Sequence, residues 1–241
     1  MRLLPCSLIP LLATCVLAAP GCIEASQKPI EYEAVAVSRG DRTAVSGKWT
    51  ITVTRAQVGL GPFYFCAAAS GSSTLCESSI AEVTRVSFVD ALSATPTPIG
   101  RVTGFSGPIR SVSYDFGISW FDTQSAATPA DVLPRGHSIR LEGFARHDAI
   151  SIELVADVDL VPQYQGQNAI STAPATADIA SSATRLEVVL EPAAWFRQVD
   201  FDALEAAGRT SVVITPGTTE HGAVLVGIKN LAPIELRWVT E

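Results

Sequence analysis

The sequence predicts an all-β fold, an antiparallel β-sandwich with one or two short helices near the C-terminus. Apolar residues recur at every second position over many short stretches, the spacing that places side chains on alternate faces of a strand. Turn residues separate these stretches, and helix signals occur only after residue 191. Many short strands with little helix favour two packed sheets over a helical bundle or an alternating α/β fold.

The first long strand is predicted over residues 48–60. Trp49, Ile51 and Val53 alternate with threonines, and the apolar phase then slips by one residue to continue through Ala56. Because an extra residue moves the following side chains to the other face, the slip predicts a β-bulge near residues 54–55.

The other strands follow at short intervals. Residues 137–145 and 149–160 are predicted to form a hairpin that turns at residues 146–148, with apolar side chains on one face and polar side chains on the other. Further strands are predicted over residues 63–66, 84–90, 109–120, 185–190, 212–215 and 234–238. This succession is typical of immunoglobulin-like or jelly-roll-like sandwiches.

The helix signals lie between the last strands. Pro192 can open a turn through Phe196, and Asp200 or Asp202 can cap a short helix that stops at Gly208. Residues 220–229 are ambiguous. Two stretches, residues 121–136 and 162–183, have no strand or helix pattern, and we expect disorder in both because loops of this length are usually functional or disordered.

The first 22 residues predict where the protein is delivered. Arg2 gives a positive start, an apolar run follows, and Ala19-Pro20-Gly21 forms a small-residue exit before Cys22, the three-part layout of a secretory signal peptide. The step Ala19-Pro20-Gly21-Cys22 resembles the lipobox of bacterial lipoproteins, although Ala19 and Pro20 depart from its usual residues. The resemblance implies that Cys22 carries a diacylglycerol and becomes the mature N-terminus.

Two other interpretations of the leader are possible. The general signal peptidase would cut the same bond without adding a lipid. An uncleaved membrane helix is disfavoured, since the apolar run is shorter than the ~20 residues of a spanning helix and contains two prolines. The predicted organisation is therefore a signal peptide over 1–21, a lipidated N-terminus and tether over 22–29, and a single sandwich domain over 30–241.

The cysteines fit lipidation. Cys6 and Cys15 fall in the leader, so three cysteines remain in the mature chain, and an odd cysteine in an exported protein needs an explanation. Lipidation of Cys22 supplies one and leaves Cys66 and Cys76 to form a disulfide, which would stabilise the chain by about 2 to 3 kcal/mol in the chain-entropy model. Two buried free thiols are the alternative.

Charge excludes one class of partner. Loss of the leader takes away Arg2, so 16 basic residues face 24 acidic ones in the mature chain, and the formal net charge is −8. The arginines form no basic run, which argues against nucleic-acid binding.

No motif specifies a chemistry. The chain contains no Gly-x-Ser-x-Gly, His-Glu-x-x-His, phosphate-binding glycine loop or Cys-x-x-Cys, so we assign no catalytic residue, cofactor or metal ligand. A Ser/His/Asp triad stays possible, because its members need to be adjacent only in space. For His137, His147 and His221 a solvated ring is the simplest expectation.

The carboxylates and aromatic residues offer weak signals. Asp157 and Asp159 share one face of a strand and could bind Ca²⁺, but the glycines of a calcium loop are missing, which favours a solvated outer face. Trp120, Phe121 and Tyr164 border the two patternless stretches and are the candidates for a sugar-stacking or partner-binding surface.

In its whole layout the chain resembles the uncharacterised predicted lipoproteins of Gram-negative bacteria. The resemblance implies a protein anchored to the membrane through an N-terminal lipid, and Ile23 after the cysteine fits the enterobacterial pattern for the outer membrane. We expect a non-enzymatic binding or structural role in the cell envelope, with a protein or glycan as the possible partner. The alternatives are an extracytoplasmic hydrolase with its site under residues 121–136 and 162–183, or a periplasmic metal-binding protein.

Overall fold

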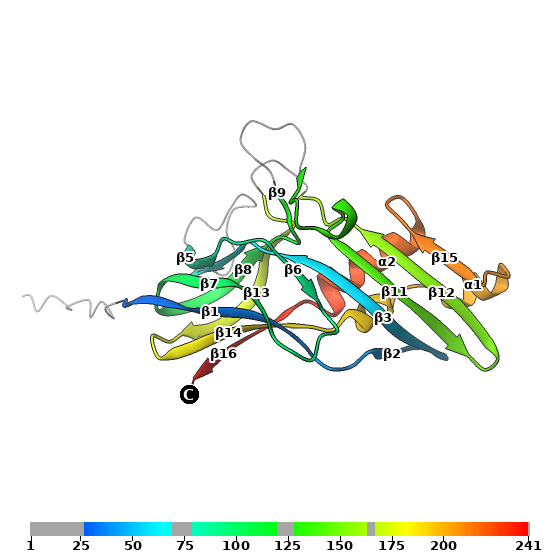
Figure 1. Cartoon of the computed structure of the whole chain (residues 1–241), viewed down its shortest axis with the longest axis horizontal. Coiled ribbons are helices and arrows are strands. Elements are labelled where there is room, and N and C mark those ends of the chain that lie inside the picture. Colours follow the sequence, from blue (N-terminus) through cyan, green and yellow to red (C-terminus); the bar gives the residue numbers. More distant parts are fainter. Residues whose placement is uncertain (1–26, 69–78, 120–127, 163–166, 241) are drawn as a thin grey trace, which may run out of the picture.

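The computed structural model describes residues 27–68, 79–119, 128–162 and 167–240. Two large β-sheets and a few short helices make up this part of the chain, which confirms the predicted all-β sandwich. Figure 1 shows the eight-stranded sheet at the left and the six-stranded sheet at the right.

The eight-stranded sheet has the strand order β13-β8-β4-β5-β7-β1-β14-β16. It curves into a half-barrel, so its two edge strands, β13 and β16, approach each other without pairing. Its strands are β1 (Pro29–Ser38), β4 (Phe63–Cys66), β5 (Ser79–Val83), β7 (Thr97–Phe105), β8 (Gly107–Tyr114), β13 (Ile170–Ile179), β14 (Ala183–Leu190) and β16 (Glu235–Thr240).

The six-stranded sheet has the order β15-β12-β11-β3-β2, with β6 paired to the end of β3. Its strands are β2 (Thr43–Ser46), β3 (Trp49–Leu60), β6 (Ser87–Asp90), β11 (Ile139–His147), β12 (Ile150–Val158) and β15 (Ser211–Ile214). A separate pair joins β9 (Ile118–Ser119) to β10 (Thr128–Pro129).

The predicted bulge in the first long strand is confirmed. Arg55 pairs with Glu142 and Val53 pairs with Gly143, which leaves Thr54 without a partner residue in the ladder. The predicted hairpin is also present, because β11 and β12 pair along their whole length and turn after His147.

The strands are not all antiparallel, contrary to the expectation. β1 pairs with β14 in parallel, and β12 pairs with β15 in parallel. Parallel neighbours need a long crossover connection. Here the segment between β14 and β15 includes helices, and β15 returns beside β12 only after it.

The short helices lie against the six-stranded sheet. The predicted turn at Pro192 is the 3-10 helix η2 (Pro192–Phe196), and the predicted capped helix is α1 (Phe201–Ala206), whose cap is Asp200. The ambiguous region is helical and forms α2 (Thr219–Val226) followed by η3 (Gly227–Leu231).

The two stretches expected to be disordered contain regular structure. Residues 128–136 include β10 and the 3-10 helix η1 (Pro134–Gly136), and residues 162–183 contain all of β13. Half of the residues of β13 are Ala, Asp or Pro, which are depleted in strands, and they weaken the signal of its Ile and Thr residues. Proline is tolerated there because β13 is an edge strand.

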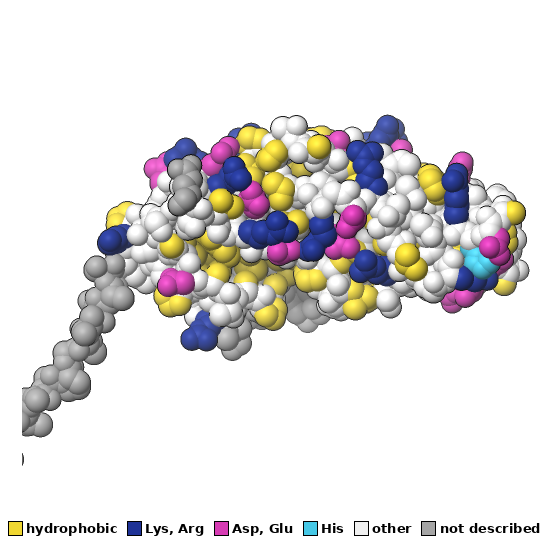
Figure 2. Space-filling view, turned by 90° about the horizontal axis from the view of Figure 1, so that it is seen from below, with side chains coloured by type: hydrophobic (Ala, Val, Ile, Leu, Met, Phe, Trp, Pro, Cys, Tyr) yellow, Lys and Arg dark blue, Asp and Glu magenta, His cyan; other side chains and the backbone are white. Residues whose placement is uncertain are grey.

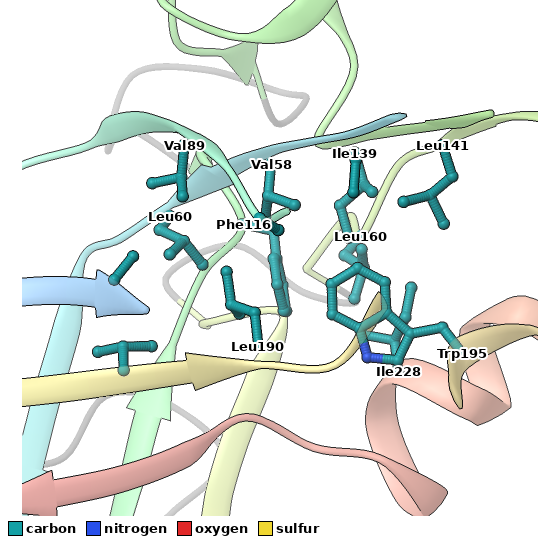
Figure 3. Close-up of a cluster of buried hydrophobic side chains, with 14 of the residues drawn as sticks. Val58, Leu60, Val89, Phe116, Ile139, Leu141, Leu160, Leu190, Trp195 and Ile228 are labelled. Atoms are coloured by element: carbon teal, nitrogen blue, oxygen red, sulfur yellow. The ribbon is translucent and has the colours of Figure 1, made fainter. Parts of the chain in front are cut away.

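One contiguous apolar core joins both sheets and the helices. In Figure 3, side chains of β3 and β11 point toward Trp195 of η2 and Ile228 of η3, with Phe116 and Leu190 between them. Trp195 is 1% exposed and its indole Nε1 donates a hydrogen bond of 3.0 Å to the Ala232 carbonyl, which ties η2 to the chain just before β16.

Candidate ligand-binding groove

A groove of about 910 Å³ lies between the two edges of the half-barrel. Apolar and aromatic side chains form most of its wall, among them Val112, Tyr114, Ile170, Ile234, Leu236 and Trp238. Figure 2 shows hydrophobic side chains gathered over this half of the molecule. The volume lies within the range of about 300–1,000 Å³ that small-molecule pockets occupy.

Small side chains on β13 keep the groove open. Ala173, Ala175 and Ala177 face the interior of the half-barrel and pack against its core, while Pro174 and Thr176 between them are exposed. Alanine at each inward position leaves space that a larger apolar residue would fill. The period-two placement is a strand signal, although alanine makes it a faint one.

The groove follows the edges of the two strands and touches residues on both of their faces. On β13 it touches inward Ala175 and outward Thr176, and on β16 it touches inward Leu236 and the neighbouring Glu235. A pocket under one face of a strand would touch alternate residues only. A ligand in this groove therefore lies beside the backbones of β13 and β16.

The two strands run in the same direction, which gives the groove two distinct ends. Seven neighbouring pairings lead across the sheet from β13 to β16, six of them antiparallel and one parallel. Each antiparallel pairing reverses the strand direction, and six reversals restore it. Ile170 and Glu235 therefore begin their strands at the same end of the groove. Lys229 and Asn230 line the groove at this end, and Trp238 lies toward the other.

The end near Lys229 has a local positive charge. Glu235 is paired with Arg39 and Arg237, and hydrogen bonding from Arg237 lowers the pKa of its carboxyl below the ordinary value. Lys229 is exposed, and no carboxylate of the described residues lies within 4.0 Å of its Nζ. An incoming ligand therefore meets a positive charge, that of Lys229, at this end of the groove.

Buried polar atoms border the groove. Tyr114 is 1% exposed, and its hydroxyl lies near the backbone of Ile234 but makes no hydrogen bond with a described residue. Burial raises the pKa of this phenol because the phenolate would be desolvated. The indole Nε1 of Trp238, which also lines the groove, is buried near the hydroxyl of Tyr32 behind the wall, but neither atom makes a hydrogen bond with a described residue.

Asp115 anchors the start of β13. It is 2% exposed, and its carboxylate accepts hydrogen bonds of 2.6 Å from Asn168 Nδ2 and 2.6 Å from the Ala169 backbone N–H. Burial raises its pKa to about 6, although the two hydrogen bonds favour the charged form. These bonds hold the residues before Ile170 against the end of β8, where the groove begins.

Most of the predicted site residues fall outside the described part of the chain. This holds for Cys22, Cys76, Trp120, Phe121 and Tyr164. Cys66 ends β4 and is buried, and its disulfide with Cys76 stays a prediction.

The three histidines lie on separate elements. His147 ends β11 and lies beside Trp49, with ring centroids 5.6 Å apart, while His221 is buried in α2. His137 precedes β11, and its Nδ1 lies 3.1 Å from Asp159. Among the described residues, no three His, Cys, Asp or Glu side chains are placed to hold a metal ion.

His137 and Asp159 are in contact as the histidine and carboxylate of a Ser/His/Asp triad would be, but no nucleophile accompanies them among the described residues. No hydroxyl or thiol of a described residue hydrogen-bonds to Nε2 of His137. Ser138 is fully buried, and its hydroxyl instead accepts from the Leu160 backbone N–H.

Asp157 and Asp159 lie half-buried on the outward-facing phase of their segment, as the sequence predicts, and each has a hydrogen-bond partner there. Asp157 accepts a hydrogen bond of 2.7 Å from Arg140 Nη1, and Asp159 accepts one of 3.1 Å from the Ser138 backbone N–H besides its contact with His137. The partner of Asp157 lies across the hairpin on β11, since Asp157 pairs with Arg140 in its register, and the partners of Asp159 lie just before β11.

Comparisons with family models, curated proteins and solved structures found no match to the chain. Within the described residues, no helix has the length and apolar character needed to span a membrane.

Proposed function

We propose that this protein is a lipid-anchored protein of the bacterial cell envelope whose half-barrel binds an elongated, mostly apolar ligand without chemical conversion. The observation that carries the proposal is the groove of about 910 Å³ between β13 and β16, with its apolar wall. Such concave apolar sites with a few polar groups are the usual form of ligand pockets.

The groove supports binding more than catalysis. No histidine lines its wall, whose polar side chains near one end are Tyr114, Ser171, Lys229, Asn230 and Glu235. Glu235, the one carboxylate among the lining residues, is paired with Arg39 and Arg237, and Ser171 donates to the Asn168 carbonyl. The two described histidine–carboxylate pairs, His137 with Asp159 and His147 with Asp148, do not line the groove. A binding role therefore needs fewer additional assumptions than a hydrolase.

The delivery part of the proposal rests on the leader. Small residues before Cys22 and the odd number of cysteines in the mature chain both fit lipidation. A ligand-binding body after a short tether would stay close to the membrane surface, since seven residues reach at most about 25 Å.

A fluorescent probe tests the groove. We expect N-phenyl-naphthylamine, a neutral apolar fluorophore, to bind the folded protein with increased emission. Ala175→Phe should abolish this binding, because the new ring points into the groove. Asp178→Phe is the matched control: its side chain is exposed on the same strand but does not line the groove, so binding should stay in place.

Thermal unfolding of both variants separates a filled groove from a damaged fold. Equal loss of probe binding in the two variants, or full binding by Ala175→Phe with an unchanged melting temperature, would exclude the groove as the binding site.

Mass spectrometry tests the anchor. A mature N-terminal peptide beginning at Cys22 with a diacylglycerol mass is expected, and Cys22→Ser should release the protein from the membrane fraction. An unmodified Cys22 thiol in the wild-type protein would rule out lipidation while leaving the groove unaffected.

A further inference from the structure

We propose that the ligand of the groove is the C-terminal segment of a partner protein, bound as an extended strand antiparallel to both β13 and β16, with its terminal carboxylate at Lys229. This inference rests on the proposed function, because it names the class of ligand for the same groove.

The first support is the pair of strand edges. β13 pairs on one side with β8, and β16 pairs on one side with β14, so within the described chain each strand has one edge facing the groove. Unpaired N–H and C=O groups on such edges are ready to pair with another strand. A peptide inserted between them would satisfy both edges at once.

The second support is strand direction. Because β13 and β16 run the same way, one inserted strand of opposite direction is antiparallel to both. Antiparallel pairing is slightly more stable per residue than parallel pairing. The inserted strand would then begin near Ala177 and Trp238 and end beside Lys229 and Asn230.

The third support is charge complementarity at the end of the strand. A free C-terminus carries one negative charge, and the groove places Lys229 where that charge would arrive. Glu235 does not oppose it, since Arg39 and Arg237 already pair with this carboxylate. A partner chain whose C-terminus is amidated, or that continues beyond the groove, would lack this attraction between a carboxylate and Lys229.

The room inside the half-barrel determines which side chains the inserted strand can carry. Every second residue of the inserted strand would face the interior, where Ala173, Ala175 and Ala177 leave room. We therefore expect apolar residues at alternate positions of the partner's C-terminal segment, and polar residues between them.

Peptide binding tests the inference. The probe is a peptide of about eight residues, a common strand length, in which Val alternates with Thr and the last residue is Phe with a free carboxylate. We expect it to displace N-phenyl-naphthylamine from the wild-type protein. Its amidated twin should bind about two- to fivefold more weakly, the size expected for an exposed ion pair.

Variants at two lysines make the test specific. Lys229→Gln should remove the preference for the free carboxylate, whereas Lys28→Gln, just before β1 and away from the groove wall, should keep it. Equal affinity of the two peptides for the wild-type protein would overturn the role of Lys229. If the fluorophore binds but neither peptide displaces it, the strand inference is wrong and groove binding stands; if the fluorophore does not bind either, both are wrong.

Cross-linking tests the orientation. A photoreactive residue next to the peptide's carboxylate should cross-link to residues 229–234, and one at its N-terminus should cross-link near Trp238. The reversed pattern would exclude the antiparallel arrangement.

Discussion

The amide of Asn168 donates a hydrogen bond of 2.6 Å to the buried carboxylate of Asp115. Asp115 directly follows β8 and Asn168 lies two residues before β13, so this bond fastens the entrance of an edge strand to the strand it pairs with. β13 forms one side of the groove. Asp115 therefore fixes the start of one side of the groove.

Asp115→Asn should change how stability depends on pH. The folded-state pKa of about 6 lies above the ordinary 3.8, so the folded protein binds this proton more tightly than the unfolded chain. The contribution of Asp115 to the free energy of unfolding is therefore greatest below pH 4. It decreases as the pH rises toward 6, by an amount on the order of 2 kcal/mol. The variant should lack this decrease.

Urea unfolding of the wild type and the variant between pH 4 and 7 measures the effect. Asp131→Asn, at an exposed carboxylate, serves as the control and should parallel the wild type. If the free-energy difference between the wild type and Asp115→Asn is the same at every pH, Asp115 does not titrate in this window.

The sequence predicts many of the strands because their signals are local, but it does not predict β5, β7 or β13. The alternation through Trp49, Ile51 and Val53 and the slip after it predicted β3 and its bulge, which the pairing of Val53 with Gly143 confirms. The parallel neighbours could not be predicted in this way. β1 and β14 are far apart in the chain, and no local pattern records that they pair.

The sequence pattern does not predict the groove, and the reason is physical. β13 alternates alanine with Pro174 and Thr176, and alanine contributes little to a hydrophobic pattern or to strand propensity. The feature that makes the groove, a row of small inward side chains, is the same feature that hid the strand. The opposite wall was predictable, since Ile234, Leu236 and Trp238 form a clear alternation.

Gly227→Ala should destabilise the protein. A Cβ at this position would lie 2.1 Å from the backbone carbonyl oxygen of Trp195, and backbone cannot move aside easily. Overpacking of this kind costs about 1–3 kcal/mol. Gly222→Ala is the matched control within α2, where an added Cβ meets nothing within 4 Å. There the better helix propensity should stabilise by about 0.5–1 kcal/mol.

Chemical unfolding of the two glycine variants gives the comparison directly. A loss of stability in both would indicate that α2 itself tolerates no change, and a gain in both would show that Trp195 and Gly227 are less tightly packed than the contact requires.

Asp200→Ala should weaken the region around α1. The side chain of Asp200 accepts a hydrogen bond of 2.9 Å from the Ala203 backbone N–H and caps the helix. Loss of such a cap costs about 1 kcal/mol. Asp200→Asn keeps an acceptor oxygen and should retain most of the stability, so equal destabilisation by the two substitutions would argue against capping.

His221→Leu should make the protein less sensitive to mild acid. Burial lowers the pKa of His221 below 6.5, because the charged imidazolium is desolvated, although the charge of Asp159 opposes the shift. Its Nε2 is buried without a hydrogen-bond partner among the described residues. The unfolded chain therefore binds the proton more tightly than the folded protein. The stability that is present above pH 6.5 is lost as pH falls below 6.5, with a slope of at most about 1.4 kcal/mol per pH unit.

The sign of this pH dependence is opposite to that of Asp115, so the measurement is best made in the Asp115→Asn background, by urea unfolding at steps between pH 7.5 and 5. We expect a shallower loss of stability in Asp115→Asn/His221→Leu than in Asp115→Asn alone; parallel curves would show that His221 contributes nothing to the acid sensitivity.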